Sequence, residues 1–395
     1  MASDNSDNKG AIRYSGDRLA DYTGLGAGRG PVDVPFMMLA LLLLTIGLVM
    51  VLSSSYARAY YDLEGQTKGN PTYYFVKQLG FAVGGVIVML ICSRLPVKFY
   101  RRFSPLVLIF AVLLLLLVFL IGRIANGAQR WLIIGGITIQ PSEIAKIGVI
   151  MFFADWICRV KGDLKNFRRG ILPLGAVLLV VCGLIATEPH WSAIMIIVFL
   201  ALVMLFVGGL PLGWFIGGGA AVGSVLLIAY TFFEYVRNRV SAWFDPFADA
   251  TNSGWQVVQS LYAIGSGGLF GLGLGNSRQK YLYLPEEHND YIFSIVCEEL
   301  GFIGAVLILA LFSLLIIRGY WLAMHARGRY GRLVCVGITT LFAVQVILNV
   351  AVCTNSMPST GISLPLFSYG GTALLLQMAE IGMILAISRT IPEKK

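Results

Sequence analysis

Residues 34–55 read VPFMMLALLLLTIGLVMVLSSS, an apolar stretch that contains no charged side chain. A helix needs about twenty such residues to cross the hydrocarbon core of a bilayer. The whole chain has this character, because 57% of its 395 residues are hydrophobic, only 13% are charged, and its mean hydropathy is +0.77. Soluble domains carry charges at about a quarter of their positions. The composition therefore predicts a membrane protein and excludes a soluble globular domain.

Ten apolar spans of this kind can be read along the chain, so the sequence predicts an all-α polytopic membrane protein with ten transmembrane helices. The spans lie at 34–55, 73–94, 104–122, 142–159, 171–187, 190–207, 212–234, 291–317, 333–354 and 371–388. A polar insert, residues 235–290, separates the seventh span from the eighth. A bilayer does not solvate arginines, carboxylates and irregular glycine-rich backbone, so we expect chemistry to collect in this insert.

Basic residues predict the orientation of the spans. They cluster after the second, fourth and eighth spans, on the side that also holds both termini: Arg94, Lys98, Arg101, Arg102; Arg159, Lys161, Lys165, Arg168, Arg169; Arg318, Arg327, Arg329 and Arg332. Loops rich in Lys and Arg stay in the cytoplasm, so the long insert is predicted to be extracytoplasmic. The net charge of +9 is explained by these loops and indicates no nucleic-acid binding.

The predicted organisation has three parts. Residues 1–33 lack an apolar core and are expected to form a disordered cytoplasmic tail, residues 34–389 form the membrane domain, and residues 390–395 form a short cytoplasmic tail. The six cysteines and three histidines show no spacing typical of a disulfide framework or a zinc site.

Charged side chains inside apolar spans are candidates for function, because each costs about 2.5–3.5 kcal/mol at a helix centre. Glu143 and Lys146 are three residues apart in the fourth span, close enough on one helical face to pair. Two interpretations are equally open, a structural staple between helices and a substrate contact. Weaker candidates, several of them near span ends, are Asp155, Glu298, Glu299 and Glu380.

The polar insert combines glycines with charges. Its glycines, at positions 265, 267, 268, 271, 273 and 275, permit close backbone approaches that side chains would block, which is typical of a loop folding back at membrane level. Glycine richness alone would favour a merely flexible hairpin. Six titratable side chains within a short stretch argue against that interpretation: Arg278, Lys280, Glu286, Glu287, His288 and Asp290.

Several motifs, in order along nearly the whole chain, resemble those of the SEDS family, the proteins of shape, elongation, division and sporulation. They are Asn126–Trp131, Gln140–Lys146, Gly254–Gln256 with Gln259–Ser260, Ala263–Gly268, Gly273–Gly275, Tyr283–Glu286, His288–Asp290 with Ile292–Phe293, Glu298–Gly304 and Leu364–Gly371. The resemblance implies a peptidoglycan glycosyltransferase that polymerises lipid II outside the cytoplasmic membrane. It also implies a class B penicillin-binding protein as the transpeptidase partner, with its single membrane helix near the eighth and ninth spans.

Two details refine the resemblance. Residues 358–369, PSTGISLPLFSY, are more similar to the division and sporulation branch, FtsW and its relatives, than to the elongation branch, RodA. This similarity implies work at the division septum with other divisome proteins. Residues 187–192 read TEPHWS, whereas the family commonly has a Pro-Asp pair followed by an aromatic or aliphatic residue and glycine. No role of that aspartate can be carried over, although His190 could offer a hydrogen bond in its place.

The chemistry of this reaction defines the groups that it needs. Forming a β-1,4 bond from an α-linked diphosphate inverts the configuration, so a single displacement suffices. A carboxylate must accept the proton of the acceptor hydroxyl, while the departing diphosphate needs a cation or metal more than an acid. The resemblance implies that Asp290 is this base. From the residues alone, the same aspartate would be assigned as the N-cap of the following helix.

The remaining candidates concern substrate binding. Candidate cations for the diphosphate are Arg130, Lys146, Arg278 and Lys280, of which Lys280 and Arg130 rank first. Further substrate-binding candidates are Glu143, Gln259, Ser260, Glu286 and His288. A divalent cation held by Asp290 or Glu286 is chemically reasonable, and metal use stays open. The long prenyl tail of such a membrane lipid requires an apolar lateral groove between helices.

Three functions from different classes stay open. The first is the glycosyltransferase, with an elongation polymerase of the RodA type as its nearest variant. The second is a lipid II flippase with a polar path along Glu143 and Lys146, although the chain shows no internal repeat of the kind common in transporters. The third is a noncatalytic scaffold of the division machinery.

Overall fold

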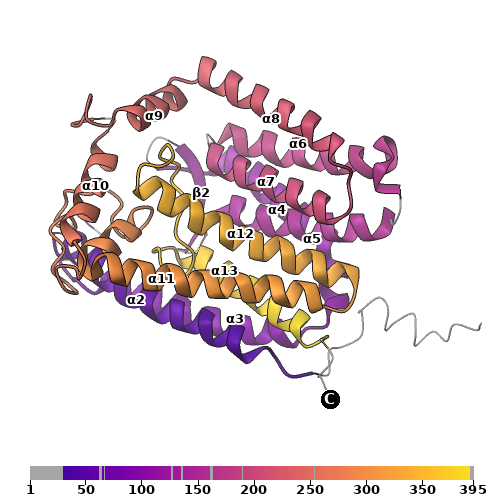
Figure 1. The fold of residues 1–395 in the computed structure, drawn as a ribbon, viewed down its shortest axis with the longest axis horizontal. Coiled ribbons are helices and arrows are strands. Elements are labelled where there is room, and N and C mark those ends of the chain that lie inside the picture. The colour runs from indigo at the N-terminus through magenta and orange to yellow at the C-terminus, as the bar shows by residue number, and fades with distance from the viewer. Residues whose placement is uncertain are drawn as a thin grey trace, which may run out of the picture.

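The structure is a computed structural model, and it describes residues 30–61, 65, 67–125, 128–134, 137–160, 163–188, 190–252 and 254–391. This part of the chain is mainly helical (Figure 1). The helices that overlap the predicted spans are α2 (Val34–Tyr61), α3 (Tyr73–Arg94), α4 (Val97–Ile121), α5 (Pro141–Val160), α6 (Leu172–Thr187), α7 (Trp191–Val207), α8 (Gly213–Phe232), α11 (Ile292–His325), α12 (Arg329–Cys353) and α13 (Gly371–Ser388). A short 3-10 turn, Asp163–Lys165, and a π-helical turn, Phe167–Ile171, precede α6.

Within the described ranges, seven helical segments are long and apolar enough to cross a membrane. They are α2, α3, α4, α6 with its preceding π-helical turn, α11, α12 and α13. Helix α7 is apolar but has only 17 residues. The polytopic helical fold is therefore as predicted, whereas the count of ten membrane spans stays a prediction.

A small antiparallel sheet corrects the prediction of an all-α protein. Strands β1 (Arg123–Ala125), β2 (Ala128–Ile134) and β3 (Ile137–Ile139) pair in that order between α4 and α5. The sequence does contain the signal, because Asn126-Gly127 and Gly135-Gly136 are two-residue turn pairs between runs rich in β-branched side chains. The sheet bears on function because β2 carries Arg130.

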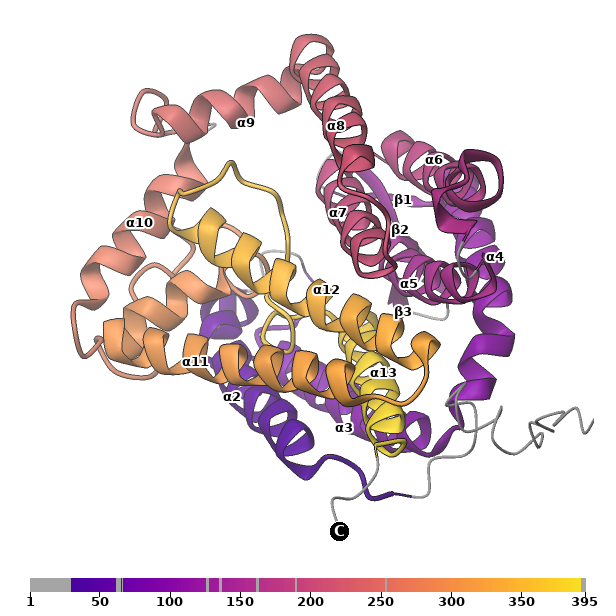
Figure 2. The same cartoon turned by 45° about the vertical axis from the view of Figure 1, so that its right-hand side comes forward.

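The helices pack as a bundle around a buried apolar core. Helix α11 packs against both α2 and α12, α13 packs against α3, and α5 packs against α4, α7 and α12. Helix α8 makes its contacts mainly with α9 (Glu234–Phe244), and both lie at the edge of the bundle in two views (Figures 1 and 2).

One end of the bundle brings both terminal segments together. Asp33 Oδ2 pairs with Arg318 Nη2 at 2.6 Å, and Gly30 N donates to Arg389 O at 3.2 Å. Residues 30–33 and 390–391 therefore lie against the bundle. The rest of both predicted tails lies outside the described residues, and the boundaries of the tails stay predictions. Arg318 also belongs to α11, because that helix runs on to His325 beyond the predicted end at 317.

A second ion cluster connects two of the predicted basic loops. Arg101 Nε on α4 and Arg159 Nη2 on α5 bind the two oxygens of Asp155, at 2.8 and 2.6 Å. Asp155 is 3% exposed, so these pairs compensate a buried charge. The basic segments after α3 and α5 thus meet at one end, as the charge pattern predicted, while the side of the membrane stays a prediction.

The insert between α8 and α11 is largely structured. It contains α9 and α10 (Trp255–Gly267), followed by a loop that leads into α11. Two reciprocal hydrogen bonds fix the end of α9, because Trp243 Nε1 donates to Asn355 O at 3.1 Å and Asn355 Nδ2 donates to Trp243 O at 3.2 Å. The insert is thereby attached to the segment between α12 and α13.

The glycine-rich loop packs against a break in α11. Gly301 interrupts this helix with a φ of +68°. The break leaves helix amides without partners, and the loop supplies one, because Phe302 N donates to Gly268 O at 2.9 Å. A Cβ on Gly301 would lie 2.2 Å from Gly271 N, so the contact requires glycine. The close backbone approach predicted from these glycines is made to α11.

Candidate active site

A tight turn, residues 286–290, presents Asp290 directly before α11. Glu286 has a φ of +57°, and its carbonyl accepts hydrogen bonds from Asn289 N at 3.0 Å and from Tyr291 N at 3.3 Å. The N-cap residue of α11 is Tyr291, and its side chain makes no capping bond. The interpretation of Asp290 as the helix N-cap is therefore wrong, and its carboxylate is available for another role.

Three consecutive carbonyls hold this turn in place. Tyr369 N donates to His288 O at 2.8 Å, and Ser368 Oγ donates to Asn289 O at 2.7 Å. Asn349 on α12 donates to the carbonyl of Asp290 at 2.7 Å, and its Nδ2 also lies 2.8 Å from Ile362 O. The segment between α12 and α13 thus fixes the backbone beneath the carboxylate, which explains why motifs far apart in sequence belong to one site.

The Asp290 side chain is directed toward Gly361. Its Oδ2 lies 3.3 Å from the position that a Cβ on Gly361 would occupy, and Gly361 has a φ of +69°. The carboxylate accepts no hydrogen bond from the part of the chain that the structure describes. Burial and the neighbouring Glu286 raise the pKa of Asp290 to about 6, although Arg239, His288 and Arg130 oppose the rise. A half-buried carboxylate with such a pKa is suited to accept a proton near neutral pH.

Arg239 is a site residue that sequence reasoning missed. It lies on α9, where its guanidinium donates to Ser359 O, and it acts electrostatically on Asp290. The candidate cations were chosen from segments that match family motifs or stand close to Asp290 in sequence. Only the packing of α9 against residues 355–361 reveals Arg239 as a neighbour of the carboxylate.

Arg130 approaches the same site from another element. From β2 its Nε donates to Glu188 O at 3.1 Å, and its charge acts on both Asp290 and His190. His190 is buried, and burial together with nearby cations lowers its pKa to about 3, so the imidazole is neutral. Its Nδ1 lies 3.4 Å from Ser142 Oγ. The structure thus brings two of the predicted residues, Arg130 and Asp290, to one site.

The fourth predicted span carries an ion pair, as its spacing predicted. Lys146 Nζ lies 2.7 Å from a Glu143 oxygen on α5, and the lysine side chain is only 3% exposed. Lys146 acts electrostatically on His190 and, together with Glu143, on the buried Glu380 of α13. The pair therefore borders the site, and both of its predicted roles stay open.

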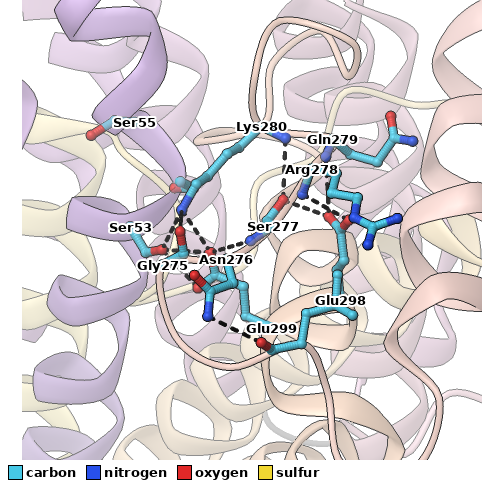
Figure 3. A network of polar contacts seen from close by, with 12 residues as sticks. Ser53, Ser55, Gly275, Asn276, Ser277, Arg278, Gln279, Lys280, Glu298 and Glu299 are labelled. Carbon is cyan, nitrogen blue, oxygen red and sulfur yellow. Dashed lines mark hydrogen bonds and ion pairs between the residues drawn. The ribbon is translucent and has the colours of Figure 1, made fainter.

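Lys280, ranked first for the diphosphate, has a different environment. Its Nζ is 3.0 Å from Glu299 Oε1, 2.6 Å from Gly275 O and 3.3 Å from Ser53 Oγ, and its side chain is 2% exposed (Figure 3). These three acceptors match the three protons of an ammonium group. The Lys280 charge is thus already neutralised within the protein, and its binding to the diphosphate stays a prediction that this environment does not favour.

Arg278 belongs to the same loop but its side chain is exposed. Its backbone N donates to Glu298 Oε1 at 2.9 Å, and Ser277 Oγ donates to the other Glu298 oxygen (Figure 3). Glu298 and Glu299 were considered weak candidates for function, and the structure gives them a structural task. They fix the loop to α11, which leaves the Arg278 guanidinium as an untested candidate for substrate binding.

Two further predicted residues are engaged inside the protein. Ser260 on α10 is fully buried, and its Oγ bonds to Ser294 Oγ at 2.6 Å and Cys353 O at 2.7 Å. His288 is 4% exposed and packs between Tyr74 and Tyr369, with ring centroids 5.0 and 5.6 Å away. Both side chains therefore have partners within the protein from distant segments, which sequence spacing could not reveal, and their predicted contacts with the substrate stay predictions.

The other two candidates of this group remain predictions. Gln259 is 6% exposed on α10, next to Ser260. Glu286 accepts from Asn289 Nδ2 at 2.6 Å, and it is close enough to raise the pKa of Asp290. In the described ranges no group of three or more His, Cys, Asp or Glu side chains could hold a metal ion. A divalent cation at Asp290 and Glu286 would therefore need ligands from the substrate or water.

An apolar groove follows α11 beside the glycine-rich loop. It has a volume of about 870 Å³ and extends from Glu299 to Leu314, with Ile46 of α2 and Phe270 of the loop on its walls. Leu307, near its middle, is 61% exposed. Such a groove has the apolar lining that the predicted lateral route requires.

Comparison with known proteins supports a common family. The family model FtsW/RodA/SpoVE, described as cell cycle protein, matches residues 34–392. Stage V sporulation protein E of Bacillus subtilis (strain 168) is 40% identical over 365 residues, covering 90% of this chain and 97% of that protein. A probable peptidoglycan glycosyltransferase FtsW of Trichlorobacter lovleyi is 35% identical over 373 residues, covering 94% of each.

Solved structures agree with this relationship. A chain from a peptidoglycan synthase complex that coordinates polymerization and crosslinking superimposes with a TM-score of 0.74 at 27% identity, covering 91% of this chain and 98% of its own length. The Rod shape determining protein RodA of Thermus thermophilus gives a TM-score of 0.65 at 26% identity, covering 92% and 98%. The fold, the order of motifs and these similarities agree, and the chain belongs to the FtsW/RodA/SpoVE family of cell cycle proteins, the SEDS family.

Proposed function

We propose that this protein is a peptidoglycan glycosyltransferase that polymerises lipid II at the outer face of the bacterial cytoplasmic membrane. One observation carries the proposal. The Asp290 carboxylate has a raised pKa, makes no hydrogen bond to the described residues, and stands on a turn whose carbonyls are fixed from α12 and the following segment. A rigid backbone beneath a side chain without its own partner is typical of a group prepared for a substrate.

The proposed reaction is a single inverting displacement. Asp290 accepts the proton of the acceptor sugar 4-hydroxyl while that oxygen forms a bond to C1 of the donor sugar. The bond between C1 and the diphosphate oxygen breaks at the same time, and its electron pair leaves with the prenyl diphosphate. The proton on Asp290 then passes to solvent, which restores the carboxylate for the next addition.

Two arginines are assigned to the departing diphosphate. Arg239 and Arg130 act on Asp290 from different elements, α9 and β2. Guanidinium groups bind phosphate oxygens in a bidentate geometry and always carry charge. Positive charge placed where the leaving group develops negative charge lowers the barrier without proton transfer. Asp290 or Glu286 would hold a divalent cation if the reaction uses one, and the cation would supply further positive charge for the diphosphate.

The groove along α11 supports a lipid-linked substrate. Its walls are almost entirely apolar, including Ile303, Leu307 and Leu311. A prenyl chain can pass from bilayer hydrocarbon into this groove without desolvating polar groups, and packing contacts with the walls would hold it there. We assign the groove to the prenyl tail, with the single helix of a partner protein as the competing occupant.

We further propose septal work with a class B penicillin-binding protein and other divisome proteins. Support for the branch comes from relatives named FtsW and Stage V sporulation protein E at 35–40% identity. Support for a partner comes from the similar chain of a peptidoglycan synthase complex. In this proposal residues 34–389 form the membrane domain, and both termini lie in the cytoplasm, as the basic loops predict.

A reconstituted assay tests the proposal. Purified protein would be incubated with fluorescent lipid II and a partner transpeptidase whose own active site is blocked. Glycan ladders on a gel are the expected result. Transbilayer movement of lipid II without ladders would instead favour a flippase, for which the buried cluster of Glu143, Lys146 and Glu380 would be the path. If the protein produces neither ladders nor movement of lipid II, the noncatalytic scaffold is the remaining function.

A further inference from the structure

Glu188 is a buried carboxyl group without a partner. It ends α6, its exposed fraction is 1%, and neither side-chain oxygen has a hydrogen-bond partner among the residues that the structure describes. Its backbone carbonyl, by contrast, accepts from Arg130 Nε at 3.1 Å. The chain therefore holds the residue firmly but leaves its functional group unsatisfied.

Three other buried carboxyl groups outside the site have charged partners. Glu299 pairs with Lys280 at 3.0 Å, Glu287 with Arg58 at 3.0 Å, and Asp155 with Arg101 at 2.8 Å. Folded proteins pair buried polar groups almost without exception, so an unsatisfied one requires an explanation. A missing ligand is such an explanation, because Glu188 borders the site already described.

The position of Glu188 relative to the site is defined by Arg130. Arg130 donates to the Glu188 carbonyl, and its charge acts on both Glu188 and Asp290, so both carboxyl groups lie near this arginine. His190, two residues after Glu188, is buried and neutral and lies beside Ser142. Arg130, Glu188 and His190 therefore form a group beside the site that carries no net negative charge when Glu188 is protonated.

Protonation of Glu188 follows from its surroundings. Burial raises the pKa of Glu188 to about 8, although Arg130 opposes the rise. At neutral pH the carboxyl group is then mainly neutral, with one O–H donor and remaining acceptor capacity. A neutral carboxyl group does not repel an anion and can donate a hydrogen bond to it.

We propose that Glu188 is a substrate-binding residue that donates a hydrogen bond from its neutral carboxyl group to a phosphoryl oxygen of the lipid-linked diphosphate, beside Arg130. This inference rests on the proposed function, because the diphosphate is the ligand of that reaction. No proton is transferred in this role. A carboxamide at position 188 can donate the same hydrogen bond and should therefore preserve activity. An apolar side chain cannot donate it and should not preserve activity.

The test compares Glu188→Gln with Glu188→Leu. Wild type and both variants would be assayed for lipid II polymerisation, for binding of undecaprenyl diphosphate, and for thermal unfolding. We expect Glu188→Gln to keep kcat/KM within about threefold of wild type, and Glu188→Leu to lose about 100-fold, as for other donors to developing anions. The binding of undecaprenyl diphosphate should weaken in Glu188→Leu alone. Its unfolding temperature should stay equal or rise, because a buried unsatisfied group is removed.

Controls separate this inference from the function on which it rests. Glu234→Leu, at an exposed position on α9, should match wild type. If Glu188→Leu does not insert, Glu188→Ala serves the same comparison. A Leu or Ala variant with wild-type kcat/KM would overturn the inference, and so would a Gln variant as inactive as the Leu variant, since that result requires proton transfer. Absence of polymer from the wild type itself would refute the proposed function instead.

Discussion

Removing the Lys280 charge should destabilise the protein without weakening substrate binding. Lys280 Nζ has three acceptors, and the exposed fractions of the two paired side chains, Lys280 and Glu299, are 2% and 0%. Lys280→Met would leave the Glu299 carboxylate buried with only the hydroxyl of Ser53 and the amide of Ser277 as partners. The sequence motif predicted the opposite outcome, a loss of diphosphate binding.

The magnitude follows from the burial of the pair. Removing one partner of a buried ion pair costs about 3–5 kcal/mol, because the remaining charge is uncompensated. Replacing both charges often costs little. The double variant Lys280→Met/Glu299→Gln should therefore be more stable than Lys280→Met alone. The coupling free energy between the two sites should be about 2–3 kcal/mol, near the upper end for residues in contact.

Unfolding of purified protein in mild detergent, followed with temperature, would measure these differences. Lys165→Met, which removes an exposed lysine, is the matched control and should unfold like wild type. Binding of lipid II would be measured in parallel at a temperature where all variants are folded. A Lys280→Met protein that unfolds like wild type but binds lipid II tenfold more weakly would refute the structural role and restore the prediction from sequence.

Three other predictions concern the site and the groove. Because protonated Asp290 cannot act as a base, kcat/KM for polymerisation should fall about tenfold per pH unit below pH 6 and level off between pH 6 and about pH 8, given the pKa of about 6. A flat profile from pH 5 to pH 8 would contradict this. Gly361→Ala should lower kcat at least tenfold, because its new Cβ would lie 3.3 Å from Asp290 Oδ2. Gly209→Ala is the control for backbone strain of about 1–2 kcal/mol, because Gly209 has a φ of +93° and no neighbour within 4 Å of its Cβ position. Leu307→Trp, which fills the groove, should raise KM for lipid II with a full prenyl tail more than for a short-chain analogue; equal effects on both would exclude the groove as the tail site.

Apolar runs allowed most helices to be predicted from sequence. The second and tenth predicted spans, 73–94 and 371–388, coincide with α3 and α13, because turn residues or charges bound each run. The pairing of Glu143 with Lys146 was also predictable, since it depends only on helical spacing. The small sheet was missed although the sequence contains its turn pairs, because its strands are far shorter than a membrane span and lie between two such spans.

The site was predictable where one short motif decides the role and not where distant segments meet. Asp290 was found through its motif. That its side chain does not cap α11 could not be predicted, because this depends on the turn at Glu286. Lys280 was assigned to the substrate because its ion-pair partner Glu299 lies in the following helix, and only the folding of the glycine-rich loop onto α11 brings the two charges together. Arg239 was missed for the same reason, since α9 approaches Asp290 only after folding.

The role of Asp290 as the base is the central claim, and Asp290→Asn tests it most directly. The substitution keeps the shape of the side chain and removes its ability to accept the proton. Glycan ladders from fluorescent lipid II should be absent with Asp290→Asn and normal with Glu234→Gln, an exposed carboxyl-to-carboxamide change on α9. Ladders of near wild-type length and amount from inserted, folded Asp290→Asn protein would contradict the account.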